Sequence, residues 1–461
     1  MIQRKSKLNK AMLWTIMSLA WPTMLEEAMQ TVVQYIDTAM VGVLGTHATA
    51  AVGATTTVSW LIWGTTAALG IGFLSYIARC YGAGEQEKVS RASAQAVMVT
   101  LISGLLVTVV CLSLSGVIPV WMQVDPSIQA LTSQYFFVMY TPMLPRTAIT
   151  IFGMVLRAAG DTKTPMKIGI SVNIINIILN FVLIYPTRTL WGMEIYGAGL
   201  GVIGAALASA IAFTLGGIAI TIAFWRHPEV SPKGCSIRPD MEILRPCMKV
   251  AVPNMLQRFG TSLGYVAFAS MVNSLGEVAT AAHTIANTVE SAFYIPGYGM
   301  QSAAATLVGN AYGARDYKRM KETGDMFLPI EITLMVVSGA TLFAFTPQLM
   351  RIFSSSDEVI HLGTTVLRMV ALTEPFYGVS LIVEGMLQGV GKTKAPFIYN
   401  IIGMWGIRIV GTYICTQYLG FGLVSAWACM IGHNLLLFVL FVRSYLSGRW
   451  NPLYQAQEFG A

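Results

Sequence analysis

Charged residues are scarce in this chain. Asp, Glu, Lys and Arg make up 11% of its 461 residues, whereas a soluble protein of ordinary composition carries about 25%. The hydrophobic fraction is 55% and the mean hydropathy is +0.62. These values exclude an ordinary soluble domain, and apolar runs long enough to cross a bilayer as helices predict an all-α integral membrane protein.

Clustered cysteines and enzyme motifs are also missing. The six cysteines are scattered and none forms a C-x-x-C pair, so we expect reduced thiols with neither disulfides nor a bound metal. No D-D-x-x-D, H-E-x-x-H or G-x-S-x-G pattern occurs, and the acidic residues are not clustered for metal chemistry. We therefore expect no enzyme, no catalytic residue and no cofactor.

The chain does contain one pattern written twice. When the sequence is aligned with itself at a constant offset, residues 20–25 match residues 251–256, and residues 160–165 match residues 391–396. No gap is needed from residue 20 to residue 165, and a single gap near position 190 then brings residues 201–206 against residues 422–427. A duplicated apolar chain is typical of transporters in which two half-bundles handle a substrate between them.

A helix needs about 20 apolar residues to cross a bilayer, and on that basis we expect twelve spans in two six-helix repeats. The spans lie near 15–43, 54–78, 95–118, 131–156, 166–186, 199–224, 248–274, 284–309, 326–346, 365–388, 397–418 and 421–443. The expected domains are an N-lobe at residues 1–224, a cytoplasmic linker at 225–247, and a C-lobe at 248–461 that includes a cytoplasmic tail. Because six is even, the two repeats enter the membrane in the same direction and are parallel.

The distribution of Lys and Arg predicts the orientation. With twelve spans, 23 of these residues lie in the termini and loops of one side, while the opposite loops hold only Arg188 and Arg351. The positive-inside rule then places both termini and the linker in the cytoplasm, in a multi-pass protein of the cell (plasma or inner) membrane. The same asymmetry explains the net charge of +7, so we expect no nucleic-acid partner.

Ionisable groups inside spans are costly, so they indicate a cavity or a partner. Polar residues form one stripe on the first span: Glu26, Gln30 and Asp37, with Gln34 beside it. A matching stripe on the fifth span consists of Asn173, Asn176 and Asn180. Asp37 and Asn180 both lie roughly 8–9 Å below the outer end of their spans. The sequence therefore predicts a small-cation site for Na⁺ or H⁺ at this depth. The alternative is that these side chains only hold helices together by hydrogen bonds.

The second half differs in chemistry, because Asp37 corresponds to Phe268 and Asn180 to Gly411. It offers other ionisable residues within its spans: Arg258, Glu290, Glu374, Glu384 and Arg408. Two interpretations remain open for them. They form buried ion pairs, such as Arg258 with Glu290 or Glu374, or they form an acidic surface that attracts a cationic substrate.

Several motifs together resemble those of the MATE multidrug exporters. They include Asp-Thr-Ala-Met-Val-Gly at 37–42, Tyr-Gly-Ala-Gly at 81–84 and Arg-Ala-Ala-Gly-Asp at 157–161, and the resemblance extends over nearly the whole chain. It implies twelve helices in two lobes around a central cavity. It further implies export of organic cations and amphipathic drugs in exchange for H⁺ or Na⁺ by alternating access, with Asp37, Asn176 and Asn180 as the cation-binding residues.

This chain departs from the family pattern at two places. One branch has carboxylates in spans seven and ten that form a C-lobe site. The matching places here hold Arg-Phe-Gly at 258–260 and Phe-Tyr-Gly at 376–378, and Glu374 is displaced by about one helical turn. Some members of the family use an amide side chain in the fourth span. No such residue is evident in the fourth span of this chain, and Thr147 or Thr150 could take its place.

One transporter alternative is a lipid-linked precursor flippase of the wider superfamily. Such a protein would need a more cationic cavity, and only Arg146, Arg258 and Arg408 lie deep within spans. We expect a monomer whose partners are the lipid bilayer and small organic cationic or amphipathic substrates. The sequence leaves open both the substrate and the choice between H⁺ and Na⁺.

Overall fold

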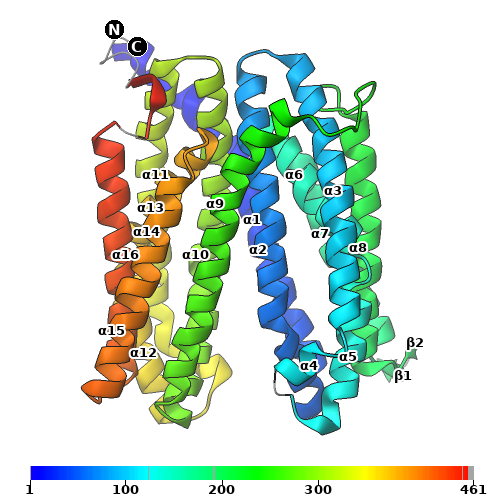
Figure 1. Cartoon of the computed structure of the whole chain (residues 1–461). Helices are drawn as coiled ribbons and strands as arrows, with labels where there is room; N and C mark the ends of the chain where they lie inside the picture. The colour runs from blue at the N-terminus through cyan, green and yellow to red at the C-terminus, as the bar shows by residue number, and fades with distance from the viewer. Residues whose placement is uncertain (1, 123, 191–192, 449, 455–461) are drawn as a thin grey trace. The chain divides into compact units, whose positions relative to one another are not determined.

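The computed structural model of the chain describes residues 2–122, 124–190, 193–448 and 450–454, and these residues are nearly all helical. Figure 1 shows the elements of the first half and their order. They are α1 (Ile2–Gly42), α2 (Thr46–Gly82), α3 (Gln86–Leu114), α4 (Ile118–Trp121), α5 (Pro126–Tyr140), α6 (Met143–Ala158), α7 (Lys163–Leu183), β1 (Pro186–Leu190), β2 (Met193–Ala198) and α8 (Gly201–Arg226).

The second half begins with α9 (Met241–Asn273), which follows a segment of turns at residues 227–240. The other elements are α10 (Glu277–Gly313), α11 (Tyr317–Phe353), α12 (Asp357–Ala371), α13 (Glu374–Gly389), α14 (Lys394–Ile401), the π-helix η1 (Ile402–Ile409), α15 (Val410–Tyr413), the π-helix η2 (Ile414–Tyr418) and α16 (Leu423–Leu446).

These elements form twelve helical segments over the described residues when α5–α6, α12–α13 and α14–η2 are each counted once and the four-residue α4 is left out, which confirms the expected all-α fold. Seven helices in the described part of the chain are long and apolar enough to cross a membrane alone, and eight are if the bent pair α12–α13 is one span. Helices α1, α9 and α10 are not among them. They carry Asp37, Arg258 and Glu290 respectively, and such residues lower the mean hydropathy.

The fourth helix of each repeat is broken at the same place. In the first half the break lies at Thr141–Pro142, between α5 and α6, and in the second it lies at Leu372–Thr373, between α12 and α13. The latter pair bends by 51°. Pro142 and Pro375 lie at these breaks, where a missing N–H interrupts the helical ladder.

The loops of the two repeats also share their backbone conformations. Gly45 (φ 107°) corresponds to Gly276 (φ 103°), and Gly160 (φ 89°) corresponds to Gly391 (φ 81°). Arg315 corresponds to Gly84 and, with φ 54°, is the one non-glycine in the left-handed region among the described residues. The loop geometry is therefore retained even where the glycine that favours it has been replaced.

The first repeat carries an insertion. Between α7 and α8 the strands β1 and β2 pair in an antiparallel hairpin, and no strand occurs between η2 and α16 in the described part of the second repeat. This hairpin lies near position 190, where the alignment of the two repeats needs its gap. The extra residues of the first repeat therefore form a local hairpin between two helices and leave the helical plan of the repeat unchanged.

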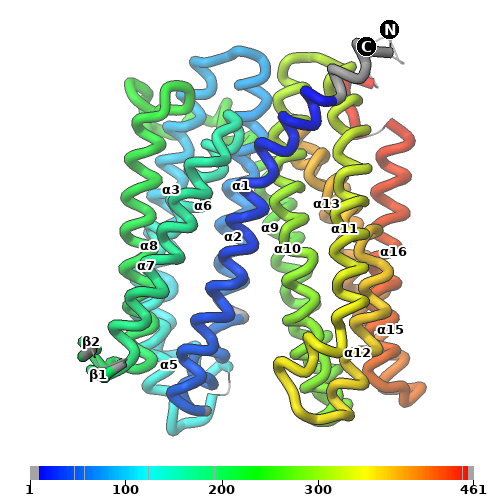
Figure 2. The backbone as a smooth tube through the Cα atoms, turned by 180° about the vertical axis from the view of Figure 1, so that it is seen from behind, coloured from blue at the N-terminus to red at the C-terminus, as the bar shows by residue number. Residues whose placement is uncertain are grey.

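The helices gather into two compact units. One unit contains residues 28–73 and 86–246, and the other contains residues 1–27, 74–85 and 247–461. In the first unit, α3, α6, α7 and α8 run side by side in both Figure 1 and Figure 2. The second unit packs α10, α11, α13 and α16 around buried side chains that include Phe327, Met386 and Phe441. Helices α1 and α2 are each divided between the two units.

The linker before α9 is held within the first unit. The Gln95 side chain donates to the carbonyl oxygen of Arg238 (2.8 Å) and accepts from the backbone N–H of Asp240 (3.0 Å). Arg91 donates to the Asp240 carboxylate, and this hydrogen bond lowers the pKa of Asp240. The segment is therefore anchored to α3 before the chain enters α9.

The end of α2 crosses α10 at a pair of glycines. A Cβ atom on Gly82 would overlap the carbonyl oxygen of Asn310, and one on Gly313 would overlap the carbonyl oxygen of Arg79. Gly82 and Gly313 occupy equivalent positions of the two repeats, and so do Arg79 and Asn310. The two backbones touch directly here because neither helix carries a side chain at the crossing.

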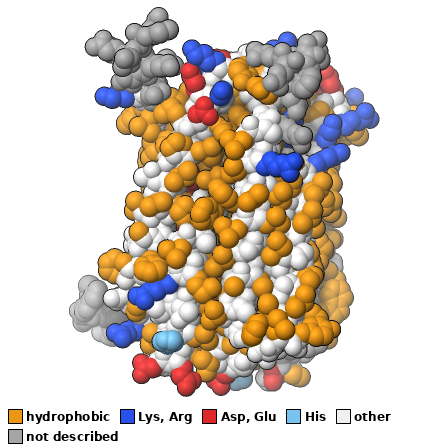
Figure 3. Space-filling view, turned by 90° about the vertical axis from the view of Figure 1, so that its left-hand side faces the viewer, with side chains coloured by type: hydrophobic (Ala, Val, Ile, Leu, Met, Phe, Trp, Pro, Cys, Tyr) orange, Lys and Arg blue, Asp and Glu red, His pale blue; other side chains and the backbone are white. Residues whose placement is uncertain are grey.

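The face drawn in Figure 3 is apolar in its middle. On the face drawn in Figure 3, hydrophobic side chains form a broad band, and most charged side chains lie toward its two ends. Such a band is what hydrocarbon requires of a lipid-facing surface.

We expect Gly82→Ala to destabilise the protein by about 1–3 kcal/mol, because the added methyl group must push two backbones apart. The matched control is Gly53→Ala in the same helix, where a Cβ meets nothing within 4 Å and alanine is the better helix former. Thermal unfolding of the purified protein should show a lower Tm for Gly82→Ala alone. Equal Tm values for the two variants would contradict the close crossing.

Candidate functional site

The Asp37 carboxylate of α1 contacts a side chain of α7. The Asn180 side chain donates from Nδ2 to Asp37 Oδ1 at 2.6 Å. Asp37 is half-buried, whereas Asn180 is only 1% exposed. A single turn of α7 therefore positions a buried amide against the carboxylate of another helix.

The Asn176 amide is the second group at this carboxylate, and its neighbours assign its orientation. Its nitrogen donates to Asp37 Oδ1 at 2.9 Å and to Oδ2 at 3.1 Å, and its oxygen accepts from Ser209 Oγ at 2.9 Å. Because the side chain is an amide, a half-turn would bring its oxygen toward Asp37 and exchange a donor for an acceptor beside the carboxylate.

Two further residues hold the cluster in place. Ser209 on α8 is a partner of Asn176 in either orientation, because its hydroxyl can donate or accept. The Tyr185 hydroxyl donates to the carbonyl oxygen of Met40 at 2.8 Å, which ties the chain just after α7 to the end of α1. Sequence analysis did not identify either residue, since Ser209 lies in an Ala-rich run and Tyr185 beyond the expected stripe.

This arrangement can hold one positive charge. Asn180 Oδ1 is buried and has no hydrogen-bond partner among the described residues. With Asn176 turned to present its oxygen, the cluster offers two carboxylate oxygens and two amide oxygens. Hard cations prefer oxygen ligands, and a single carboxylate matches the charge of Na⁺ or of a proton.

The other expected supporting residues are not brought to Asp37 by any recorded contact. Gln30 and Gln34 are exposed, and Glu26 belongs to the compact unit that does not contain Asp37. Asn173 has no recorded hydrogen bond in the described part of the chain. Thr147 is buried with no partner for its hydroxyl among the described residues, and the Thr150 hydroxyl donates to the carbonyl oxygen of Arg146 (3.3 Å).

The equivalent place in the second half is closed by apolar packing. Phe268 is 1% exposed and belongs to a hydrophobic cluster. A Cβ atom on Gly411 would lie 3.0 Å from the sulfur of Cys429. The architecture is repeated there without the carboxylate or the amide.

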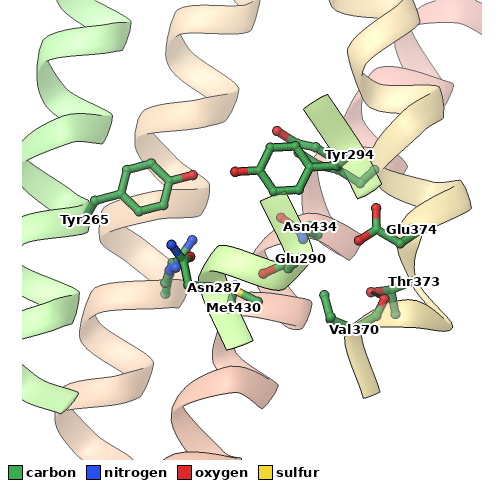
Figure 4. A pocket seen from close by; sticks show the side chains of 11 residues that line it. Tyr265, Asn287, Glu290, Tyr294, Val370, Thr373, Glu374, Met430 and Asn434 are labelled. Atoms are coloured by element: carbon green, nitrogen blue, oxygen red, sulfur yellow. Dashed lines mark hydrogen bonds between the residues drawn. The ribbon is translucent and has the colours of Figure 1, made fainter. Parts of the chain in front are cut away.

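The ionisable residues of the second half gather elsewhere. Glu290 on α10 and Glu374 on α13 line one recess, and Figure 4 shows them with Tyr265, Asn287, Tyr294 and Asn434 around it. Arg408 also lines this recess, whereas Arg258 does not. Arg258 donates from Nε to Asn254 Oδ1 at 3.0 Å on its own helix. Glu384 lies apart and accepts from Gln257 at 2.8 Å.

One buried acid was not expected to matter. Glu331 on α11 is 0% exposed, and neither of its carboxylate oxygens has a partner among the described residues. It lies against Gly297 and Gly378, whose missing side chains leave room for it. In the sequence, Glu331 is a single acidic residue in an apolar run. That pattern does not distinguish a buried acid from an acid at the end of a helix.

A family model described as MatE matches residues 22–182 and again residues 253–414. The two matches begin at Pro22 and Pro253, which the internal repeat also aligns with each other. They cover most of both halves of the chain.

Individual proteins match over almost the full length. A probable multidrug resistance protein NorM from Thermotoga maritima is 26% identical over 94% of this chain and 92% of its own. A MOP superfamily transporter from Pyrococcus furiosus has the same fold, with a TM-score of 0.86, 24% identity, and coverage of 95% of this chain and 96% of that chain. A structure described as MATE in complex with MaL6 gives a TM-score of 0.87 at 24% identity, covering 96% of this chain and 97% of that one.

We expect Asn176→Ala to destabilise the protein by about 1–3 kcal/mol, because it leaves Ser209 and the Asp37 cluster without a buried partner. The matched control is Asn173→Ala, one turn earlier on the same helix, which should change the stability by less than about 0.5 kcal/mol. Thermal unfolding of the purified variants measures both. A similar loss in the two variants would show that Asn176 acts only as a generic helix contact.

Proposed function

This chain belongs to the MatE family, and from that premise we propose that it exports organic cations and amphipathic drugs across the cell membrane in exchange for H⁺ or Na⁺. Members of the family are transporters, in keeping with the expectation that the chain is not an enzyme. The relative from Thermotoga maritima bears a name that refers to multidrug resistance, and the substrate class proposed here follows that name.

The observation that carries the proposal is the Asp37 cluster. A carboxylate held by buried amides inside a span is maintained at a cost. Binding of a cation by the carboxylate offsets this free-energy cost, and a transporter must both bind and release such a cation. When a cation is bound, the Asn176 oxygen faces Asp37; when the site is empty, the Asn176 nitrogen turns to Asp37 and donates to both carboxylate oxygens. Each state then satisfies the carboxylate with a different set of contacts.

Helix α1 offers a route from this site to the rest of the protein. It is continuous from Ile2 to Gly42, yet residues up to 27 belong to one compact unit and residues from 28 belong to the other. A ligand shifts a conformational equilibrium only through its different affinities for the two states. A cation that tightens α1 against α7 would therefore bias an alternating-access equilibrium in both units through one helix.

The orientation in the membrane follows from the loops. We propose that both termini and the linker face the cytoplasm, because the Lys and Arg residues of the connecting segments concentrate on that side. The Asp37 site then lies nearer the outer surface, where it can load a cation that enters down its gradient.

We expect Asp37→Asn to abolish gradient-driven export while leaving a folded protein, because the amide keeps the shape of the side chain but lacks the negative charge that balances a bound cation or proton. The measurement is efflux of a cationic dye from liposomes containing the purified protein, with Na⁺ and pH gradients imposed separately. The matched control is Asp357→Asn, which removes an exposed carboxylate at the start of α12. Export by Asp37→Asn at the full rate would remove the coupling role of Asp37.

We expect Asn180→Ala to raise the ion concentration for half-maximal export by about tenfold, since losing one buried ligand costs about 1.4 kcal/mol. The ion is the one whose gradient drives export by the unmodified protein. Asn173→Ala is the control, because Asn173 has no recorded contact with Asp37, and its half-maximal concentration should stay unchanged. An unchanged value for Asn180→Ala would exclude Asn180 as a ligand.

A further inference from the structure

Two cysteines of the second repeat lie side by side near the end of the α14–η2 segment. The sulfur of Cys415 on η2 is 4.0 Å from the sulfur of Cys429 on α16, and both residues are free thiols. Both are half-buried, so neither is fully enclosed by the protein. A disulfide needs a sulfur–sulfur distance of about 2.05 Å, so the two sulfur atoms are about 2 Å beyond bonding distance.

Helical spacing brings the two thiols to one contact. Gly411 and Cys415 are four residues apart, so they share a face of their helical segment. That face packs on α16, because a Cβ atom on Gly411 would lie 3.0 Å from the sulfur of Cys429 and 3.6 Å from its Cβ atom. The missing side chain at Gly411 leaves room for that sulfur. Rotation about the Cα–Cβ bond moves a cysteine sulfur by up to about 3 Å between staggered positions, which exceeds the remaining gap.

The backbone places the two cysteines on the two arms of one helical corner. Cys415 lies in the π-helix η2, and π-helical turns occur frequently at functional sites. The chain then turns at Gly420 (φ 66°) and begins α16 at Leu423. Cys415 and Cys429 are 14 positions apart, a spacing that matches no cysteine motif, so the sequence predicted only reduced thiols. A bond between them would join the two arms of the corner.

The pair belongs to the second repeat alone. In the alignment of the two repeats, Cys415 corresponds to Ile184 and Cys429 corresponds to Ala208. Ile184 is 1% exposed and Ala208 is 0% exposed, so the repeated architecture fills these two positions with ordinary apolar side chains. Because the shared fold does not require sulfur at either position, packing alone does not account for two thiols in contact.

The corner carries the residues that are typical of the end of a membrane span. Tyr413 and Tyr418 are 49% and 75% exposed, and their rings meet edge to face with centroids 5.7 Å apart. Tyrosine is enriched where lipid meets water. Gln417 donates to Ser274 Oγ at 3.1 Å, and both of these polar side chains are exposed. With the orientation proposed above, the corner faces away from the cytoplasm, on the side where disulfides form and persist.

We propose that Cys415 and Cys429 are a redox-active pair, held ready for a disulfide that joins η2 to α16, with a low-molecular-weight disulfide as the oxidant. One cysteine thiol loses its proton, and its sulfur attacks the reagent, which releases one small thiol and leaves a mixed disulfide. The second cysteine then loses its proton and attacks the sulfur of the first, which releases the second small thiol. Two electrons pass from the pair to the reagent, and the two released thiols take up the two protons.

The first test detects the bond. The purified full-length protein in lipid nanodiscs is incubated with hydroxyethyl disulfide, a small neutral disulfide, at mildly alkaline pH, where more of each thiol is ionised. After denaturation and alkylation of the remaining thiols, mass spectrometry should find Cys415 and Cys429 joined, with the loss of two hydrogen atoms. Dithiothreitol should return both to thiols. Two alkylated cysteines, or a lasting mixed disulfide on either one without a cross-link, overturns the proposal.

The second test asks whether the corner accepts the bond without strain. Thermal unfolding should show a Tm that is higher by roughly 2–5 °C in the oxidised protein than in the reduced one, because the bond restricts the unfolded chain. Cys415→Ser and Cys429→Ser should each abolish this difference. Cys235→Ser is the matched control, because Cys235 is also half-buried but lies in the linker, and it should keep the difference. A bond that leaves the Tm unchanged or lowers it overturns the proposal that the corner is prepared for it.

The outcome is separable from that of the export proposal. Asp37→Asn should lose gradient-driven export and yet form the disulfide as readily as the unmodified protein, since Asp37 lies in the other compact unit. Normal coupled export of a cationic dye by a protein that forms no bond between Cys415 and Cys429 would sink the redox pair alone.

Discussion

The hydrogen bond between Asn180 and Asp37 joins α7 to α1 and gives a half-buried carboxylate a partner within the protein. In lipid, each polar group must be satisfied by the protein itself. The amides of Asn176 and Asn180 do so, and Ser209 supports them from α8. The proposed cation site depends on this constraint, because the same groups can satisfy the carboxylate by donating hydrogen bonds or share a cation with it.

The duplication supplies two copies of one architecture, and the chemistry has diverged between them. Loop backbones at equivalent positions keep the same φ values, the fourth helices break at the same residue, and Gly82 and Gly313 allow the same close approach. The Asp37 cluster of the first repeat is replaced in the second by Phe268 and Gly411. The second repeat instead buries Glu290, Glu374 and Arg408 around a separate recess. One repeated scaffold therefore carries two different sets of ionisable side chains.

Much of the first site could be predicted from the sequence. The spacing of Asn173, Asn176 and Asn180 placed them on one face of a helix, and equal depth brought two of them to Asp37. Asn173 shows the limit of that argument, because it shares the stripe but has no recorded contact with Asp37. Glu26 and Gln30 share the stripe of Asp37 in the same way, yet one lies in the other compact unit and the other is exposed. Spacing fixes an angle about a helix axis, but it does not say which neighbouring helix lies at that angle.

The sequence by itself determined that the chain is a helical membrane protein of two repeats, and that Asn176 and Asn180 share one face of a helix in the first. These follow from local periodicity, hydropathy and charge, which act within one helix or loop. Only the tertiary structure decided that α1 and α2 are each shared between two compact units, and that Arg408 rather than Arg258 lines the recess with Glu290 and Glu374. Those outcomes depend on contacts between residues far apart in the chain, and Arg408 lies in a π-helix that local spacing does not predict.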